Sequence, residues 1–250
     1  AFRALRSSLL LSHLDRPPRV MLVTSALPGE GKTTVCANLG RTLAAFGSKV
    51  VLIDADLRRP RLHRAFKVPK DRGLANVLAH SAPVEDVIFP SQYPNLFVIP
   101  GGPCPPDPAT LLHPDRTTHI VRMLTLERGF DFVLFDSPPV LVFADAFNLM
   151  QATEGVVLVA RSMQTPKEAL RSACEQIRKI KTPILGLVTN DESEEAGSAS
   201  YYRYYHYRRG YYKKAMEARG GEEHELATGP TEIPAFDDDH DHDEAGTRAS

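Results

Sequence analysis

The stretch RVMLVTSALPGEGKTT, residues 19–34, leads from an apolar run through a glycine-containing turn into a helix-forming segment. A turn of this kind between a strand and a helix is the setting of a phosphate-binding loop. The backbone N–H groups of the turn surround the phosphates, its lysine neutralises the β and γ oxygens, and its hydroxyl binds Mg²⁺. We therefore predict a nucleotide site formed by Pro28, Gly29, Glu30, Gly31, Lys32, Thr33 and Thr34.

One position departs from the usual GxxxxGK[ST] pattern, because Ala26 replaces its first glycine. A strict search for the pattern would miss this loop, although the second half of the pattern matches in full. Alanine is small enough to preserve the turn. The alternative is a helix N-terminus that carries glycines by chance.

Six apolar runs recur along the first 190 residues, and most are too continuously apolar for strands with one face in water. They occupy residues 19–26, 49–56, 95–102, 130–137, 155–162 and 184–191. Parallel strands covered by helices on both faces explain this pattern best. We predict an α/β fold of the P-loop NTPase type, with a mostly parallel central sheet flanked by helices on both faces.

Two of the intervening helices have recognisable ends. Residues 33–46 lead to Gly47, which suits the left-handed position after a helix. A second helix begins with Thr165, Pro166 and Glu168, and this spacing predicts a capping box. One face of that second helix is apolar, and it comprises Leu170, Ala173, Cys174, Ile177 and Ile180.

The composition limits the classes of function. The 250 residues include 30 Lys and Arg against 31 Asp and Glu, so there is no general basic field for nucleic acid. Cys36, Cys104 and Cys174 are too few and too scattered for a disulfide framework or a zinc site, so we expect packing thiols in a reducing cytosol. No apolar window reaches the roughly 18 to 20 residues that span a bilayer, and no signal peptide opens the chain. The chain starts at Ala1 rather than at methionine, which leaves room for a membrane segment upstream.

From Asp191 onward the composition becomes acidic and rich in small residues, which predicts a tail without a core of its own. We therefore divide the chain into a domain of residues 1–190 and a flexible tail of residues 191–250. The tail contains YYRYYHYRRGYY, residues 201–212, with seven of the eight tyrosines of the chain. We interpret the run of Asp and His near the end as a solvated acidic terminus rather than a cation site.

The tyrosines of residues 201–212 are interleaved with Arg, His and Gly, so a buried aromatic cluster is excluded. Four interpretations remain: an accident of composition, a platform for stacking nucleic-acid bases, a patch for a membrane surface, or a set of hydroxyls that are themselves substrates. The net charge of −1 weakens the nucleic-acid interpretation. The hydroxyls in question are those of Tyr201, Tyr202, Tyr204, Tyr205, Tyr207, Tyr211 and Tyr212.

Two further apolar runs end in aspartate, as VVLIDAD at Asp54 and Asp56 and as FVLFDSPP at Asp136. The carboxyl ends of parallel strands meet at the crevice that holds a phosphate loop. A single aspartate in this setting would often cap the next helix, but three of them point to the nucleotide. We predict that Thr33 and a strand-end aspartate hold Mg²⁺, which leaves another aspartate to act as a base.

The sequence resembles the bacterial tyrosine kinases, or BY-kinases, which regulate the export of capsule and exopolysaccharide. Their three nucleotide motifs match here as ALPGEGKT, VLIDADLRRP and FVLFDSPP. The stretches RGLANVLAH and LFVIPGGPCPPDPATLL and the tyrosine cluster resemble the family as well. The resemblance covers residues 1 to about 190 and 201–212. The HRD and DFG triplets of eukaryotic kinases are absent from the sequence.

The resemblance implies an ATP-dependent protein-tyrosine kinase that phosphorylates its own tyrosine cluster, each subunit acting on its neighbour in a ring. It implies that Lys32 and Thr33 bind phosphates and Mg²⁺. It also implies that Asp56 and Asp136 hold the ion directly or through water, and that Asp54 accepts the tyrosine proton. The residues alone leave open which of Asp54 and Asp56 is the base.

The resemblance extends to both ends of the domain. Arg3 and Arg6 match the arginines of the family's oligomerisation motif ExxRxxR, and their spacing places them on one side of a helix. The glutamate of that motif would precede Ala1. Asn190, at the end of the last strand, is implied as an adenine contact.

The family also implies partners. They are a membrane activator of the polysaccharide co-polymerase type, either separate or fused upstream, a ring-like homo-oligomer of the chain itself, and a cognate tyrosine phosphatase, with no nucleic acid. The kinase would then be cytoplasmic and held at the inner face of the bacterial cell membrane by its activator. Arg58 and Arg59 are candidates to steady the triphosphate or a neighbouring subunit.

Two other classes compete with the kinase. Cell-division and plasmid-partition ATPases carry an extra lysine five residues before the loop lysine, where this chain has Leu27, and have no use for a tyrosine cluster. The third class is a regulator that binds nucleotide and docks to a membrane protein without catalysis. The full set of Lys32, Asp54, Asp56 and Asp136 favours an enzyme.

Overall fold

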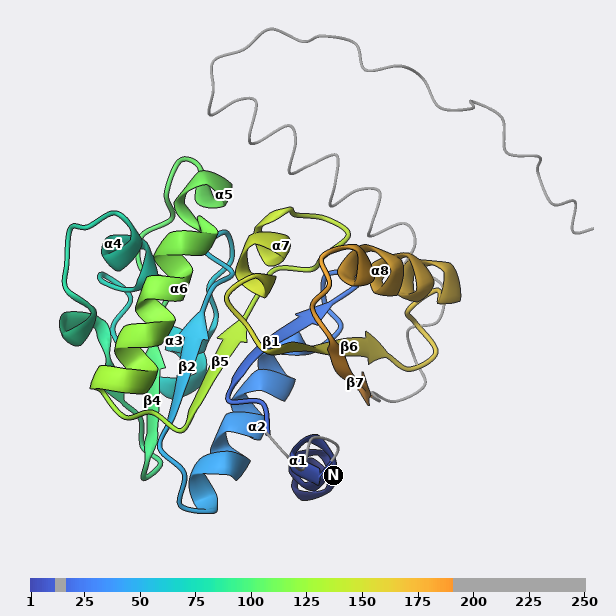
Figure 1. Ribbon diagram of the computed structural model, residues 1–250, viewed down its shortest axis with the longest axis horizontal. Coiled ribbons are helices and arrows are strands. Elements are labelled where there is room, and N and C mark those ends of the chain that lie inside the picture. Colours follow the sequence, from blue (N-terminus) through green and yellow to red (C-terminus); the bar gives the residue numbers. More distant parts are fainter. Residues whose placement is uncertain (12–16, 191–250) are drawn as a thin grey trace, which may run out of the picture. The chain divides into compact units, whose positions relative to one another are not determined.

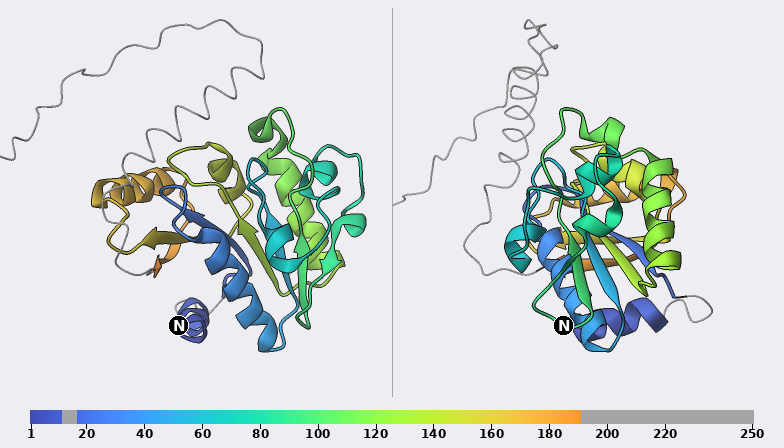
Figure 2. Two further views of the ribbon diagram at one scale, coloured as in Figure 1. Left: turned by 180° about the vertical axis from the view of Figure 1, so that it is seen from behind. Right: turned by 90° about the vertical axis from the view of Figure 1, so that its left-hand side faces the viewer.

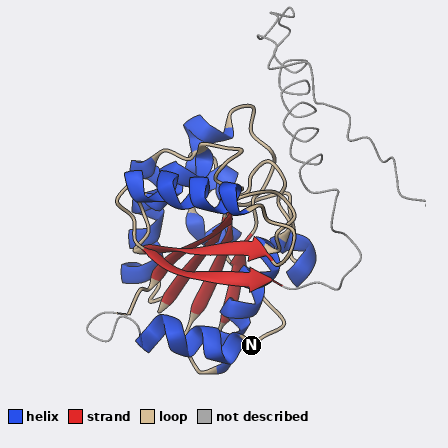
Figure 3. Ribbon diagram, turned by 90° about the vertical axis from the view of Figure 1, so that its right-hand side faces the viewer, coloured by secondary structure: helices blue, strands red, loops and turns tan. Residues whose placement is uncertain are grey.

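The computed structural model describes residues 1–11 and 17–190, and both stretches belong to one compact unit. The predicted tail, residues 191–250, and its tyrosine cluster lie outside the described residues. Within the unit, a seven-stranded sheet lies between helices on both faces (Figure 1, Figure 3). The predicted α/β class is therefore confirmed.

The sheet is parallel except at one edge, and its strand order is β3-β4-β2-β5-β1-β6-β7. The strands are β1 (Val20–Ser25), β2 (Val50–Asp54), β3 (Phe89–Pro90), β4 (Leu96–Ile99), β5 (Phe132–Asp136), β6 (Gly155–Arg161) and β7 (Ile184–Asn190). Only β3 pairs antiparallel, with β4. The other six strands all fall within the predicted apolar runs. β1 is therefore an interior strand, between β5 and β6, and the phosphate loop follows it.

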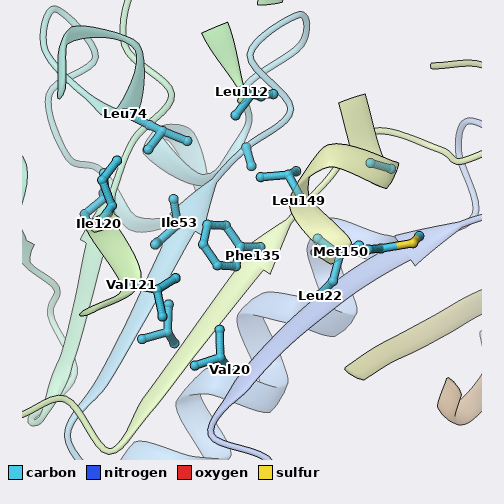
Figure 4. Packing of buried hydrophobic residues seen from close by; sticks show 14 of the residues in the cluster. Val20, Leu22, Ile53, Leu74, Leu112, Ile120, Val121, Phe135, Leu149 and Met150 are labelled. Carbon is cyan, nitrogen blue, oxygen red and sulfur yellow. The ribbon is translucent and has the colours of Figure 1, made fainter. Parts of the chain in front are cut away.

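Alternation of side chains along the strands divides the core into two clusters, one on each face of the sheet. In β2, Val51 and Ile53 belong to one cluster, and Val50 and Leu52 belong to the other. Because both faces are apolar, both need a cover of helices. Figure 4 shows part of the first cluster, with Ile53 and Phe135 from neighbouring strands side by side.

The helices divide between the two faces (Figure 2). Side chains of α1 (Phe2–Leu11), α2 (Lys32–Ala45) and α3 (Leu62–Phe66) enter one cluster, and those of α4 (Leu74–Leu78), α6 (Pro114–Arg122), α7 (Asp145–Met150) and α8 (Lys167–Lys179) enter the other. The remaining turns are the 3₁₀-helix η1 (Val84–Val87), α5 (Pro108–Leu111) and the π-helix η2 (Met123–Glu127). Within residues 1–11 and 17–190, none of the helices combines the length and the apolar character that crossing a membrane requires.

The predicted end of α2 and the predicted apolar face of α8 are both confirmed. Gly47 has a φ of 91° and donates its N–H to the Ala44 carbonyl at 2.9 Å, as expected after a helix. On α8, Ala173 and Ile177 are buried in the core. The other three residues of the predicted face pack against that core: Leu170, Cys174 and Ile180.

The predicted capping box at the start of α8 is wrong. The helix begins at Lys167, with Pro166 in the N-cap position, and the described residues provide no side-chain cap. The Thr165 oxygen accepts the Arg161 N–H at 2.8 Å, and its hydroxyl donates to the Glu30 carboxylate. A tertiary contact has therefore taken the hydroxyl that the capping box required.

Three further features of the structure differ from what the sequence predicts. The two-residue strand β3 is too short to leave a periodic signal. β7 lies at an edge of the sheet, so Leu187 is 49% exposed despite the apolar run that contains it. Cys104 is exposed in the loop after β4, whereas Cys36 is buried and Cys174 packs on the core, as expected of packing thiols.

Candidate functional site

The phosphate loop joins β1 to α2 and depends on two left-handed glycines. Gly29 has a φ of 84° and Gly31, at the N-cap of α2, has a φ of 92°. Glycine adopts these angles without the steric cost of a Cβ atom. At Gly31 a Cβ atom would also lie 2.1 Å from Nδ2 of Asn190. The shape of the loop therefore requires glycine at both positions 29 and 31.

Glu30 lies between these glycines, and its side chain binds protein atoms. It is 3% exposed, and one carboxylate oxygen accepts the Leu27 N–H at 2.8 Å. The other oxygen accepts the hydroxyl of Thr165, which is 135 residues away in sequence. Burial raises the pKa of Glu30, and the Leu27 N–H and the Thr165 hydroxyl oppose that rise. Glu30 was predicted in the loop from the sequence pattern, whereas no local pattern links Thr165 to it.

Strands β2 and β5 bring the predicted carboxylates to the loop. Asp54 and Asp136 are the last residues of these neighbouring strands and are paired in register. Asp56 follows two residues later, and its Oδ2 lies 3.5 Å from Nζ of Lys32. Lys32, Asp54, Asp56 and Asp136 thus converge at one edge of the sheet, as the strand-end argument predicts.

Several carboxylate oxygens at this edge are buried without a donor. Among the described residues, none completes a hydrogen bond to Oδ1 of Asp54 or to either oxygen of Asp136, although Thr33 is near enough to lower the pKa of Asp136. Buried acceptors without partners are costly, so this arrangement fits a cation. Within residues 1–11 and 17–190, no three His, Cys, Asp or Glu side chains are grouped so that they could hold a metal ion without other ligands. Mg²⁺ suits such a site, because it usually takes one or two carboxylates together with phosphate oxygens and waters.

The same burial raises the pKa values of two carboxyl groups. The pKa of Asp136 rises to about 6, mainly because burial disfavours its charge, while Lys32 acts in the opposite direction. The pKa of Asp54 lies well above its usual range, because of burial and the neighbouring Asp136. A carboxylate with a raised pKa is better matched to accepting a proton near neutral pH.

Asp54 also caps a helix. Its Oδ2 accepts the Arg61 N–H at 2.7 Å and the Leu62 N–H at 2.8 Å, where α3 begins. This is the structural role considered for a single strand-end aspartate in the sequence analysis. Since only one of its two oxygens is engaged in this way, Asp54 serves the helix and still presents an acceptor to the site.

Asn190 lies beside the loop, and Arg58 contacts a different part of the protein. Asn190 donates from Nδ2 to the Glu30 carbonyl at 3.3 Å. The Arg58 guanidinium forms two hydrogen bonds with Asp145, Nε to Oδ2 at 2.6 Å and Nη2 to Oδ1 at 3.1 Å, and stacks 4.6 Å over the Phe143 ring. The sequence analysis considered Arg58 for the triphosphate and missed Asp145, because no local pattern links residues 87 apart.

The arginines of the predicted oligomerisation motif lie on α1, near the opposite end of α2 from Lys32. The Arg6 guanidinium stacks 4.0 Å over the ring of Phe46, which follows α2. Arg3 lines a surface pocket of about 490 Å³ together with Arg41 and Tyr93 among others. These residues are therefore not part of the phosphate site.

The chain matches a protein-family model described as "AAA domain" over residues 19–186. It is 38% identical over 206 residues to the tyrosine-protein kinase YwqD of Bacillus subtilis, a match that covers 82% of this chain and 84% of YwqD. It is 34% identical over 190 residues to EpsB of Ralstonia solanacearum, covering 76% of this chain and 25% of EpsB. The relatives thus include proteins of similar length and much longer ones.

Solved structures share the fold. The kinase domain of the Escherichia coli tyrosine kinase ETK has a TM-score of 0.73 and 31% identity, over 80% of this chain and 77% of that chain. The chimerical protein CapA2B2 has a TM-score of 0.72 and 30% identity, over 78% of this chain and 84% of that chain. The septum site-determining protein MinD of Pyrococcus horikoshii, solved with Mg-ADP, has a lower TM-score of 0.59 and 29% identity, over 69% of this chain and 70% of that chain. The extra lysine expected of such ATPases would stand five residues before Lys32. This chain has Leu27 at that position, and its side chain is buried, 5% exposed.

Proposed function

This chain belongs to the bacterial tyrosine-protein kinase family, and from that premise we propose that it transfers the γ-phosphoryl group of ATP to tyrosines of its own cluster, residues 201–212. The observation that carries the proposal is the convergence of Lys32 with Asp54, Asp56 and Asp136 beside the phosphate loop. Phosphoryl transfer depends on positioning and on neutralising charge at the phosphate oxygens. Lys32 provides a positive charge for that purpose, and the three carboxylates provide ligands for a metal ion and an acceptor for the tyrosine proton.

Thr33, Asp56 and Asp136 are the residues that we assign to Mg²⁺. Neither oxygen of Asp136 has a donor within residues 1–11 and 17–190, and this supports the assignment, because a cation would compensate their burial. When bound, the ion would neutralise charge on the β- and γ-phosphate oxygens. Lys32 would contribute a second positive charge, and the N–H groups of the glycine turn would hold the phosphates in place.

Asp54 is the residue that we assign as the general base. The tyrosine oxygen attacks the γ-phosphorus, the bond from that phosphorus to the leaving ADP oxygen breaks, and the phenolic proton passes to Asp54. A phenol with a pKa of about 10 is mostly neutral at pH 7, so an acceptor within hydrogen-bond reach assists the attack. Two observations support this role: Oδ1 of Asp54 has no donor in the part of the chain that the structure describes, and the pKa of Asp54 is raised.

Asn190 is the residue that we assign to adenine. Its position against Gly31 and the Glu30 carbonyl places it next to the loop that receives the phosphates. A nucleotide bound to the loop would therefore extend toward the end of β7. The amide of Asn190 offers both a donor and an acceptor for the edge of a base.

The partners follow from the family. We propose a membrane activator of the polysaccharide co-polymerase type, which would hold the kinase at the cytoplasmic face of the membrane and link it to capsule or exopolysaccharide export. The likeness to the chimerical protein CapA2B2 and the match to 25% of the length of EpsB support this proposal, with the activator either separate from the kinase or fused to it. We further propose a ring in which Arg3 and Arg6 take part and each subunit phosphorylates the tail of its neighbour, and a tyrosine phosphatase that reverses the reaction.

Incubation of the purified chain with labelled ATP and Mg²⁺, with and without an activator fragment, tests the proposal. We expect label on the seven tyrosines of residues 201–212 and on no other stretch. Lys32→Met should bind ATP poorly and incorporate no label, because it loses the charge that faces the phosphates. Its melting temperature should stay close to that of the unchanged protein, because Lys32 is not part of the apolar core.

Two outcomes would contradict the proposal. ATP hydrolysis without label on tyrosine would favour a positioning ATPase, and nucleotide binding without turnover would favour a non-catalytic regulator. Label incorporated by Lys32→Met at the normal rate would show that the site lies elsewhere.

A further inference from the structure

A closed set of hydrogen bonds links the phosphate loop to two segments distant in sequence. The Glu30 carboxylate accepts the hydroxyl of Thr165, whose oxygen accepts the N–H of Arg161 at 2.8 Å. The Ser162 N–H donates to the carbonyl of Asn190 at 2.9 Å. Asn190 in turn donates a hydrogen bond from its side chain to the Glu30 carbonyl at 3.3 Å, which closes the set. Both the side chain and the backbone of Glu30 are thus held by the ends of β6 and β7.

The Glu30 carboxylate also closes the phosphate loop on itself. It accepts the Leu27 N–H at 2.8 Å, so it joins the first part of the loop to the last. This contact lies next to Ala26, where the usual pattern has glycine. Each of the hydrogen bonds to this carboxylate is charge-assisted when Glu30 is ionised, and such bonds are stronger than those between neutral groups.

Thr165 makes this contact at the expense of a local one. The sequence Thr165-Pro166-Lys167-Glu168 favours a capping box, which would place the hydroxyl on the first turn of α8. In the structure the hydroxyl binds Glu30, and among the described residues no side chain caps α8. A local rule that is broken in favour of a tertiary contact is most often found at a functional site.

We infer that Glu30 and Thr165 form a positioning pair that holds the phosphate loop in its nucleotide-binding conformation. The inference rests on the proposed nucleotide site. A loop built around two left-handed glycines has many alternative conformations when it is free, because glycine loses more conformational freedom on ordering than any other residue. Removing the Glu30–Thr165 hydrogen bond would lower the fraction of molecules whose loop can bind nucleotide. The apparent nucleotide affinity falls in proportion to that fraction.

Calorimetric titration of the full chain with Mg-ADP measures the binding affinity and tests this pairing. Glu30→Ala and Thr165→Val should each weaken binding about tenfold, the size expected for a hydrogen bond to a charged group. The double variant should bind Mg-ADP as tightly as the single variant with the lower affinity, because both changes break the same contact. Thr165→Ser keeps the hydroxyl and should bind as the unchanged protein does.

Thr153→Val is the matched control. Thr153 is also partly buried and donates its hydroxyl to a backbone carbonyl, that of Met150 at 2.9 Å. It lies just before β6, whose first residue, Gly155, pairs with Met21 near the start of β1, whereas the loop follows the end of β1. This variant should keep the normal affinity. In the kinase assay, Thr165→Val should raise the KM for ATP about tenfold and leave kcat within about twofold, because saturating ATP selects the competent loop.

The outcomes separate this inference from the proposed function. If the unchanged protein binds Mg-ADP and Thr165→Val binds it equally well, the positioning pair is refuted and the nucleotide site stands. Effects of the two single variants that multiply in the double variant would also refute the pair. If Glu30→Ala fails to fold, Thr165→Val and Thr165→Ser alone decide the matter. Failure of the unchanged protein to bind any nucleotide would instead refute the proposed function.

Discussion

Asp54 divides its two carboxylate oxygens between the fold and the proposed chemistry. Oδ2 caps α3 through the N–H groups of Arg61 and Leu62, and Oδ1 has no donor among the described residues. Asparagine at this position would keep an oxygen for the helix cap but could not accept a proton. Asp54→Asn should therefore retain ATP binding and lose phosphotransfer by about 10²-fold or more.

Quench-flow or initial-rate measurements over a range of Mg²⁺ concentrations would check this prediction. Asp56→Asn is the matched comparison, because Asp56 contacts Lys32 and is assigned to the metal. It should raise the Mg²⁺ concentration needed for half-maximal activity. If Asp54→Asn raises the Mg²⁺ requirement instead and is normal at saturation, the roles of Asp54 and Asp56 must be exchanged.

Asp136 should make the nucleotide-free protein less stable as the pH rises. Its pKa of about 6 in the folded protein lies above the ordinary value of 3.8, so the folded state binds more protons than the unfolded state between these two values. Stability due to this group is thus greatest below pH 4 and is lost as the pH rises to about 6, by about 3 kcal/mol at about 1.4 kcal/mol per pKa unit. The main cause is the burial of the charge, and the neighbouring Asp56 adds to it.

Asp136→Asn removes that charge and should stabilise the protein at pH 7.5 in the presence of a chelator. Chemical denaturation of both proteins from pH 4 to pH 8 measures the difference in unfolding free energy. We expect the difference to grow between pH 4 and pH 6 and to stay constant above. A difference that is independent of pH, or that grows toward acid, would contradict the assigned pKa.

At the scale of elements, the Arg58–Asp145 pair joins the segment after β2 to the start of α7. Asp145 is 1% exposed and its two oxygens are both bound by the Arg58 guanidinium. Removing one partner of a buried pair leaves an uncompensated charge. Arg58→Ala should therefore lower the free energy of unfolding by about 3 kcal/mol.

The pair formed by Arg128 and Glu85 provides the comparison for Arg58→Ala. Its side chains are 41% and 43% exposed, so solvent screens their charges. Arg128→Ala should cost less than about 1 kcal/mol. Urea titrations of both variants at the same pH would measure these differences. Equal costs would show that the Arg58–Asp145 pair does not join the two elements more strongly than a surface contact does.

At the scale of the whole molecule, phosphorylation of the tyrosine cluster would change the charge of that segment from positive to negative. Each phosphotyrosine adds a charge of about −1.5 to −2 at neutral pH, so several of them would make a locally basic segment strongly negative. Such a tail would be repelled by a site with three carboxylates and a bound triphosphate. If unmodified tails hold a ring together, phosphorylation should favour monomers.

Light scattering on the phosphorylated protein and on Lys32→Met measures this switch. The protein used for this measurement should carry a glutamate immediately before Ala1, so that the pattern ExxRxxR is complete and assembly does not depend on Arg3 and Arg6 alone. We expect Lys32→Met, which stays unphosphorylated, to have the larger mass over a range of concentrations. Equal masses at every concentration would rule out the switch.

The main features of the fold could be predicted from the sequence because they arise from short-range patterns. A buried parallel strand needs apolar residues on both faces, and a strand-to-helix phosphate loop needs glycines at fixed positions. Each of these requirements is met by a single short stretch of consecutive residues, such as 19–34 or 130–137. The position of Asp54 and Asp136 at strand ends then placed them at one edge of the sheet.

By itself, the sequence determined the parallel sheet, the phosphate loop and the convergence of Lys32 with three carboxylates. Only the tertiary structure decided the partner of Thr165, the Arg58–Asp145 pair and the partial exposure of β7. The reason is that a hydroxyl or a guanidinium has several partners of similar energy within reach, both local and distant. Which partner it binds depends on how the chain brings together residues 135 or 87 positions apart, and no local pattern records that distance.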